Sequence, residues 1–142
     1  MSRPIPYLPF FVYGTLLPGE INFGLWREAI DDMRPAILVG ARLYDLGYFP
    51  MALEAGQGEL RGVVAWVRPS SYVAALSLLD QLEGVALSWG RPGYRRVRRI
   101  VRSTGDSTLV AWVYLGYEAV VVNLKPIALD WKRHKREVVN AL

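Results

Sequence analysis

The chain of 142 residues has no cysteine and a single histidine, His134. Without cysteine it can form no disulfide, no thiolate nucleophile and no cysteine metal site. One histidine excludes a histidine-rich metal centre, and its place in a basic C-terminal stretch disfavours a catalytic triad. The lack of cysteine also fits a reducing compartment.

Long apolar runs are missing as well. No run reaches the roughly 18 residues that a membrane-spanning helix requires. The N-terminal stretch from Met1 to Pro6 is too rich in proline and too poor in apolar side chains for a signal peptide. We therefore expect a soluble, cytoplasmic protein that does not contact a membrane.

What the chain does have is a large hydrophobic fraction, 52 % of its residues, which disfavours intrinsic disorder. The length suits one domain with its own core, and no linker, repeat or low-complexity segment interrupts it, so residues 1–142 are expected to form a single domain. The formal net charge of +4 suits an anionic small molecule or a loose contact with nucleic acid. Charge alone does not choose between them.

The most informative local motif is FFVYGTLLPG at residues 10–19. Apolar and aromatic residues run straight into Gly14 and Thr15, a pattern typical of a buried strand that ends in a tight loop. The backbone N–H groups of such a loop can bind one anion, either a carboxylate or a phosphate. An ordinary strand-to-helix turn explains the same residues. The loop is not a P-loop, because it lacks the Gly-Lys-Ser/Thr ending.

A second motif ends the clearest helix of the chain. Val73, Leu76 and Leu79 recur at helical spacing, and Gly84 is a natural stop. Glu83 precedes this glycine among apolar neighbours. If the fold buries its carboxyl group, the lost hydration raises the pKa and makes Glu83 a proton shuttle near neutral pH. The alternative is an exposed glutamate in the last turn of a helix.

The rest of the pattern consists mainly of strands. The sequence predicts strands at residues 9–13, 36–44, 60–67, 94–102 and 108–115. It also predicts a bend over 46–53, a turn at 54–58, a hairpin loop at 103–107, and helices at 22–29 (capped by Asn22) and 127–141. Gly62 indicates a bulge or a close backbone approach. Because strands and helices do not alternate regularly, we expect an α+β fold in which a mainly antiparallel sheet curls into a small barrel with helices outside.

Tyrosines and arginines complete the candidates. Tyr13, Tyr48, Tyr94 and Tyr114 lie in or beside predicted strands, where a hydroxyl can orient a substrate, although most of them are expected to be core or rim residues. Six arginines lie between residues 91 and 102, and the five within the predicted strand fall on both of its sides, so they form no single basic face. A charge-protected sheet edge is the favoured interpretation, and nucleic-acid binding is disfavoured.

Two further surfaces are interpreted from the sequence alone. The basic stretch at 132–136 is taken as a solvated helix face or a flexible end. An apolar face at Phe23, Leu25 and Trp26 could serve an interface, so a homodimer is a candidate assembly.

The ordered set of motifs resembles the gamma-glutamylcyclotransferase-like family, also called the AIG2-like family. The matching segments are Val12–Leu16, Pro18-Gly19 with Asn22, Leu46–Pro50, Gly62–Val64, Leu79-Asp80 with Glu83–Val85, Tyr94–Arg96 and Ala111–Tyr114. The resemblance extends from about residue 9 to residue 116. The segment 117–142 matches poorly, and residues 86–93 depart from the pattern in a way that could reshape the mouth of a cavity.

The resemblance implies a small mixed, mainly antiparallel β-barrel with flanking helices. It implies an enzyme that releases 5-oxoproline from a gamma-glutamyl amine or amino acid by intramolecular cyclisation, with Glu83 as general acid/base. It places substrate binding at Tyr13, Gly14, Thr15, Leu16 and Tyr114. This chemistry requires no metal and no cofactor, and the expected partner is a small gamma-glutamyl substrate. A non-catalytic protein that binds a small carboxylate in the same fold is the alternative.

Overall fold

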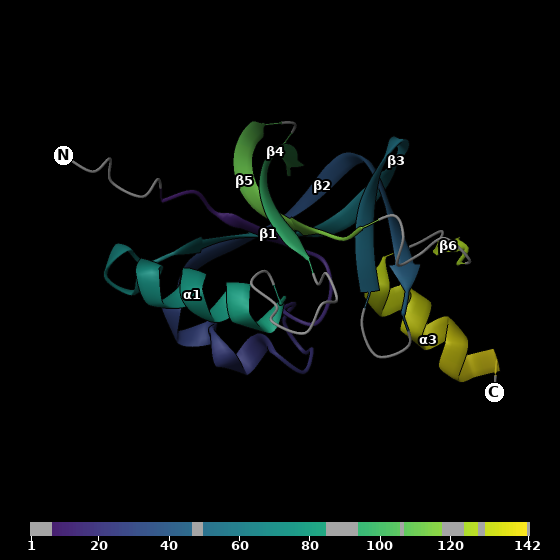
Figure 1. Cartoon of the computed structure of the whole chain (residues 1–142), viewed down its shortest axis with the longest axis horizontal. Coiled ribbons are helices and arrows are strands. Elements are labelled where there is room, and N and C mark those ends of the chain that lie inside the picture. The colour runs from purple at the N-terminus through teal and green to yellow at the C-terminus, as the bar shows by residue number, and fades with distance from the viewer. Residues whose placement is uncertain are drawn as a thin grey trace.

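The computed structural model describes residues 7–46, 50–84, 94–105, 107–117, 124–127 and 130–141 (Figure 1). Within these ranges five strands close into a barrel: β1 (Phe10–Val12), β2 (Ile30–Asp45), β3 (Pro50–Val67), β4 (Arg95–Ser103) and β5 (Thr108–Leu115). They follow the order β3-β1-β5-β4-β2, and β2 pairs again with β3 to close the sheet. A short strand, β6 (Pro126–Ile127), adds to β2.

The barrel is mixed, as predicted. β1 and β5 run parallel to each other, with Phe10 opposite Trp112, whereas the other recorded pairs are antiparallel. β2 and β3 form one long hairpin that supplies most of the wall. At Gly62 the strands approach so closely that an added Cβ would lie 2.3 Å from the carbonyl oxygen of Val12. The close backbone approach predicted at this glycine is therefore confirmed.

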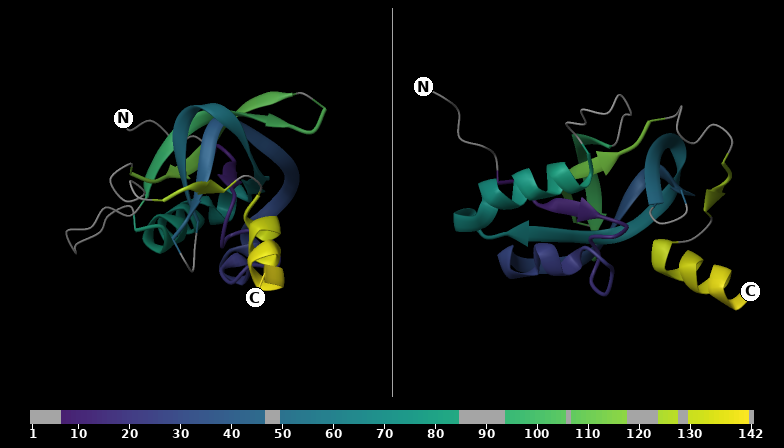
Figure 2. Two further views of the ribbon diagram at one scale, coloured as in Figure 1. Left: turned by 90° about the vertical axis from the view of Figure 1, so that its right-hand side faces the viewer. Right: turned by 60° about the horizontal axis from the view of Figure 1, so that its bottom comes forward.

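Helices cover the barrel from two sides (Figures 1 and 2). α1 (Tyr72–Leu82), which follows the 3₁₀ turn η3 (Pro69–Ser71), lies along β1, and α3 (Trp131–Ala141) lies near the far end of the β2–β3 hairpin. Two further 3₁₀ turns, η1 (Phe23–Leu25) and η2 (Arg27–Ala29), lie below α1 in Figure 1. None of the helices in the described ranges has the length and apolar character needed to cross a bilayer.

Alternation along β1 divides the core into two clusters, because successive strand residues face opposite sides. Phe10 and Val12 pack outward with Tyr72 and Leu79 of α1. Phe11 faces the other way, into the barrel, where its cluster includes Val64 of β3, Val113 of β5 and Trp131 of α3. The first cluster attaches α1 to the barrel, and the second fills the barrel itself.

Several predicted elements are confirmed. The first strand, the helix ending before Gly84 and the β4–β5 hairpin are present, although Asp106 of the hairpin loop lies outside the described residues. Gly84 has a φ of +68°, the left-handed conformation in which glycine commonly ends a helix. The C-terminal helix starts at Trp131 rather than near 127, since Pro126 and Ile127 belong to β6.

Other predictions were wrong in detail. The helix predicted at 22–29 is a pair of 3₁₀ turns, and the Asn22 side chain caps neither of them. It donates instead to Thr15 Oγ1 at 3.0 Å. The turn predicted at 54–58 does not separate two strands, because β3 continues through it as a bulge: Val39 pairs with Glu59, and Ala41 already pairs with Glu54. Within 46–53, residues 47–49 lie outside the described residues and Pro50 begins β3.

Candidate active site

The loop Gly14–Glu20 follows β1, and Gly14 is packed against Pro50 at the start of β3. A Cβ on Gly14 would lie 2.5 Å from Pro50 Cγ, so no larger residue fits without displacing the proline. The loop is closed by three backbone bonds: from Leu17 N to the Gly14 oxygen at 3.1 Å, from Glu20 N to the Leu17 oxygen at 2.9 Å and from Asn22 N to the Thr15 oxygen at 2.9 Å. Packing and hydrogen bonds thus fix the loop from both sides.

The N–H groups of this loop have the character of an anion site. Among the residues that the structure describes, no hydrogen-bond acceptor is recorded for the backbone N–H groups of Gly14, Thr15 and Leu16. Gly14 and Leu16 are buried, and Thr15 is half-buried. Buried backbone donors are normally paired, so three consecutive ones without an acceptor can take a carboxylate.

Glu83 is placed by the end of α1. Its N–H donates to the Leu79 oxygen at 2.9 Å, and the left-handed turn at Gly84 then ends the helix. Its carbonyl oxygen accepts from Tyr94 N at 2.9 Å, which links the helix end to the start of β4. The Glu83 residue is half-buried. Burial of its carboxyl group raises the pKa of that group from 4.5 to about 7. At neutral pH the group can therefore both accept and donate a proton.

Three buried tyrosines lie within electrostatic reach of this carboxylate. Burial raises the pKa of Tyr13, Tyr94 and Tyr114 well above the usual value, and the charge of Glu83 contributes to the increase at each of them. Tyr13 directly precedes Gly14 in the chain, so one of these tyrosines adjoins the loop. Each phenol therefore stays neutral throughout the physiological pH range.

The hydroxyl groups of these tyrosines hold the site together. Tyr13 donates to the carbonyl oxygen of Tyr114 at 2.5 Å and accepts from Ala52 N at 3.2 Å. Tyr94 donates to the carbonyl oxygen of Pro50, the residue that packs on Gly14. The tyrosines thereby join β1, β3, β4 and β5 around the carboxylate.

Asp80 is also a member of this network, although the sequence reasoning assigned it no role beyond its place in the Leu79-Asp80 motif. The Tyr114 hydroxyl donates to Asp80 Oδ1 at 2.7 Å, and Arg96 Nε contacts the same oxygen at 2.9 Å. The Arg96 guanidinium also lies over the Trp112 ring, 4.3 Å from its centroid. Asp80, in the last turn of α1, and Glu83, which caps that helix, stand three residues apart, a spacing that puts two side chains on one helix face and could have identified the pair.

The predicted site residues therefore fall into two groups. Tyr13, Tyr114 and Glu83 come together, and Gly14, Thr15 and Leu16 follow Tyr13 in the chain. Tyr48, Val85 and the departing segment 86–93 lie outside the described residues. The apolar face proposed for an interface is largely internal, because Trp26 is only 2 % exposed and Phe23 packs against the core, which leaves Leu25 as its exposed member.

Four of the five arginines of β4 are paired with carboxylates, Arg96 with Asp80 as described above and three others with residues of β3. Arg95 and Arg99 contact Glu54 at 3.8 and 2.6 Å, and Arg102 contacts Glu59 at 3.4 Å. The strand itself is not a sheet edge, because β4 pairs with β5 on one side and with β2 on the other, so the predicted charge-protected edge was wrong.

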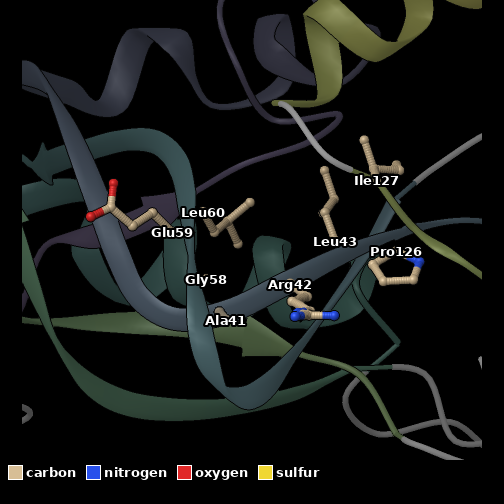
Figure 3. Close-up of a pocket in the computed structure, with 8 residues that line it drawn as sticks. All are labelled: Ala41, Arg42, Leu43, Gly58, Glu59, Leu60, Pro126 and Ile127. Atoms are coloured by element: carbon tan, nitrogen blue, oxygen red, sulfur yellow. The ribbon is translucent and has the colours of Figure 1, made fainter.

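A separate hollow of about 320 Å³ lies beside the β3 bulge (Figure 3). It is lined by Ala41, Arg42, Leu43, Gly58, Glu59, Leu60, Pro126 and Ile127. In Figure 3 the Glu59 carboxylate points away from the other lining side chains. None of these residues is a predicted site residue, so this hollow is distinct from the Glu83 network.

Comparison with known proteins places this arrangement in a family. A family model described as gamma-glutamyl cyclotransferase, AIG2-like, matches residues 10–133. The chain therefore belongs to the AIG2-like gamma-glutamyl cyclotransferase family. The match continues into α3, farther along the chain than the motifs alone indicated. A search of curated proteins gave no match.

Solved structures share the fold. An AIG2-like protein from Mus musculus aligns with a TM-score of 0.65 at 23 % identity, covering 85 % of this chain and 86 % of that one. YkqA from Bacillus subtilis aligns with a TM-score of 0.69 at 24 % identity over 94 % of this chain, but the present chain spans only 42 % of YkqA. The ytfP protein of Escherichia coli aligns with a TM-score of 0.60 at 25 % identity, covering 90 % of this chain and 99 % of that one.

Proposed function

We propose that the protein is a gamma-glutamyl cyclotransferase that releases 5-oxoproline from a gamma-glutamyl amine or amino acid. The observation that carries the proposal is the Glu83 carboxyl group, whose pKa is raised to about 7 and whose charge acts on Tyr13, the residue before the Gly14 loop. Membership of the family supports the same class of reaction. In this proposal the proton shuttle and the anion-binding loop serve one substrate.

The first step is removal of a proton from the substrate. The α-amine of a gamma-glutamyl compound is an ammonium ion at neutral pH and cannot attack until it is deprotonated. The Glu83 carboxylate takes this proton, and the free amine nitrogen then attacks the γ-carbonyl carbon. A five-membered ring forms in this step, with a tetrahedral carbon that carries the former carbonyl oxygen. A base with a pKa near 7 suits this transfer, because it is ionised to a useful degree at the working pH.

The loop would supply orientation. The N–H groups of Gly14, Thr15 and Leu16 bind the α-carboxylate, which fixes the adjacent amine relative to Glu83. Holding the amine and the γ-carbonyl in near-attack geometry can contribute about 7–11 kcal/mol in well-oriented intramolecular reactions. Tyr114 forms part of the wall. Its hydroxyl donates to Asp80, so its oxygen lone pairs remain to accept from the substrate ammonium.

The second proton transfer completes the reaction. The protonated Glu83 gives its proton to the leaving nitrogen, and the bond between that nitrogen and the γ-carbon breaks. The ring nitrogen gives up the second of the two protons that it still carries, and the departing amine takes it up to leave as an ammonium ion. The products are 5-oxoproline and a free amine or amino acid, and no water is consumed. The base of the first step is thus the acid of the second, and Glu83 ends in its starting state.

The test is to incubate the purified protein with a panel of gamma-glutamyl amines and amino acids and to measure 5-oxoproline by mass spectrometry. We expect product with at least one member, and we expect Glu83→Gln to lower turnover by roughly 10²–10⁴-fold, the usual contribution of a general acid/base. Glu28→Gln is the matched control, because it makes the same chemical change at an exposed position on η2. Circular dichroism verifies that both variants are folded.

Two outcomes would count against the proposal. Absence of product across the panel from a folded protein, combined with thermal stabilisation by the same compounds, would indicate the non-catalytic carboxylate-binding alternative. Unchanged turnover in Glu83→Gln would remove Glu83 from the mechanism even if the reaction occurs.

A further inference from the structure

The loop Gly14–Glu20 contains a buried carboxylate at its far end. The Glu20 side chain is only 8 % exposed. Its Oε1 accepts from Trp131 Nε1 at 3.1 Å and from Lys135 Nζ at 2.6 Å, and both donors belong to α3. Burial of an unpaired charge costs free energy. The Glu20 carboxylate is therefore buried only while α3 is docked and supplies these two donors.

A third contact reaches the middle of the loop. The Lys132 ammonium donates to the carbonyl oxygen of Pro18. The side chains of Trp131, Lys132 and Lys135 in α3 therefore contact the loop at two residues, Pro18 and Glu20. In Figure 2 the start of α3 lies beside the segment that follows β1, which agrees with these contacts.

Other contacts anchor α3 to the barrel. Trp131 is 2 % exposed and belongs to the cluster that fills the barrel. His134 Nε2 contacts Asp45 Oδ2, at the end of β2, at 2.8 Å. The helix is thus attached to rigid elements on one side and to the loop on the other, as a positioning element requires.

We propose that α3 positions the candidate substrate loop through Glu20, Lys132 and Lys135. The contacts at Pro18 and Glu20 lie in the section between Leu17 and Asn22, whose amides bond to the Gly14 and Thr15 oxygens, and Glu20 N bonds to the Leu17 oxygen within that section. Fixing this middle section fixes the direction of the N–H groups of Gly14, Thr15 and Leu16 before any ligand arrives. The role assigned to those N–H groups rests on the proposed function, whereas the hold of α3 on the loop does not.

The proposal predicts a specific kinetic signature. The α-carboxylate of the substrate does not change during ring closure, so its contacts with the loop are equally strong in the ground state and the transition state. Weakening such contacts raises KM, and the looser orientation of the amine relative to Glu83 lowers kcat, so kcat/KM falls. Loss of one hydrogen bond to a charged group corresponds to an increase in KM of about tenfold.

The test compares Lys135→Met and Lys132→Met with Arg136→Met. Each change removes one cation from α3, but Arg136 is exposed and has no recorded contact within the described residues. Amide hydrogen exchange of Leu17 and Asn22 is measured by NMR, together with KM and kcat. We expect about tenfold faster exchange at these two amides in the first two variants, unchanged exchange at Val113 in the barrel, and no effect of Arg136→Met. Lys135→Arg should restore slow exchange.

Each outcome bears on a different claim. Equal exchange at Leu17 and Asn22 in all variants overturns the proposal that α3 holds the loop, whether or not the protein is an enzyme. Faster exchange with an unchanged kcat/KM overturns the positioning role. If the wild-type protein forms no 5-oxoproline, the proposed reaction fails. The positioning role is then tested by measuring, by calorimetry, the affinity of the same variants for free 5-oxoproline in place of KM. Binding of that carboxylate without any loss in Lys135→Met would also overturn the positioning role.

Discussion

Burial raises the pKa of Glu83 from 4.5 to about 7, so the native protein keeps a proton on this group over a pH range in which the unfolded chain has lost it. Between pH 4.5 and about pH 7 the native state therefore binds more protons than the unfolded state. The free energy of unfolding falls as the pH rises through this range. Above that range the ionised carboxylate costs up to about 3 kcal/mol of folding free energy.

Replacement of Glu83 by glutamine removes this cost. We expect Glu83→Gln to be more stable than the wild type by about 1–3 kcal/mol at pH 8 and to differ little from it near pH 4.5. Urea unfolding at the two pH values measures the difference. A variant that is equally stable at pH 8, or less stable, would show that the carboxyl group is not held in a poorly hydrated place.

Gly14 allows a similar test of the loop. An added Cβ would meet Pro50 Cγ at 2.5 Å, and Pro50 is also the residue whose carbonyl accepts from Tyr94. We expect Gly14→Ala to cost about 1–3 kcal/mol, as overpacking usually does, and to impair substrate binding. Gly24→Ala is the control, since nothing lies within 4 Å of its added Cβ. Equal stabilities of the two variants in urea would contradict the close packing at Gly14.

At the scale of elements, the end of α1 determines where Glu83 points. Gly84 has a φ of +68°, and alanine in that conformation costs roughly 1–2 kcal/mol. We expect Gly84→Ala to lose this stability and, because Glu83 shifts, to lower kcat by roughly tenfold or more. Thermal melting and initial rates measure the two effects.

Gly105 provides the matched control for that experiment. It has a φ of +87° in the β4–β5 loop, and nothing lies within 4 Å of its added Cβ. Gly105→Ala should therefore cost a similar amount of stability and leave kcat unchanged. An equal loss of activity in both variants would attribute the effect to general destabilisation instead of to the position of Glu83.

The predictability of each element follows from the range of its contacts. α1 and the β4–β5 hairpin were predictable because their signals are local: helical spacing of apolar residues, and turn residues between two strands. The glycines at 56 and 58 do adopt positive φ values of 70° and 101°, as a turn requires, yet β3 continues because β2 pairs with it on both sides of the bulge. The docking of α3 was not predictable, since Glu20 and Lys135 are 115 residues apart.

At the scale of the molecule, the candidate site likewise combines residues with a local sequence signal and contacts between residues far apart in the chain. The motifs singled out Glu83 and the Gly14 loop because each has a local signature. The contacts of Tyr94 with Glu83 and with Pro50, and the link from Tyr114 to Asp80, exist only once the barrel closes. Sequence reasoning could therefore name the acid and the loop, but not the tyrosine network that joins them.

The charge of the whole molecule leads to a prediction about nucleic acid. The net charge is +4, but Arg95 and Arg99 are paired with Glu54. We expect a labelled single-stranded oligonucleotide to bind no more tightly than about 100 µM at physiological salt, in fluorescence anisotropy. Glu54→Gln releases both arginines and should tighten binding, with an affinity that falls as salt increases. Tight, salt-dependent binding by the wild type would show that these ion pairs do not neutralise the β4 surface.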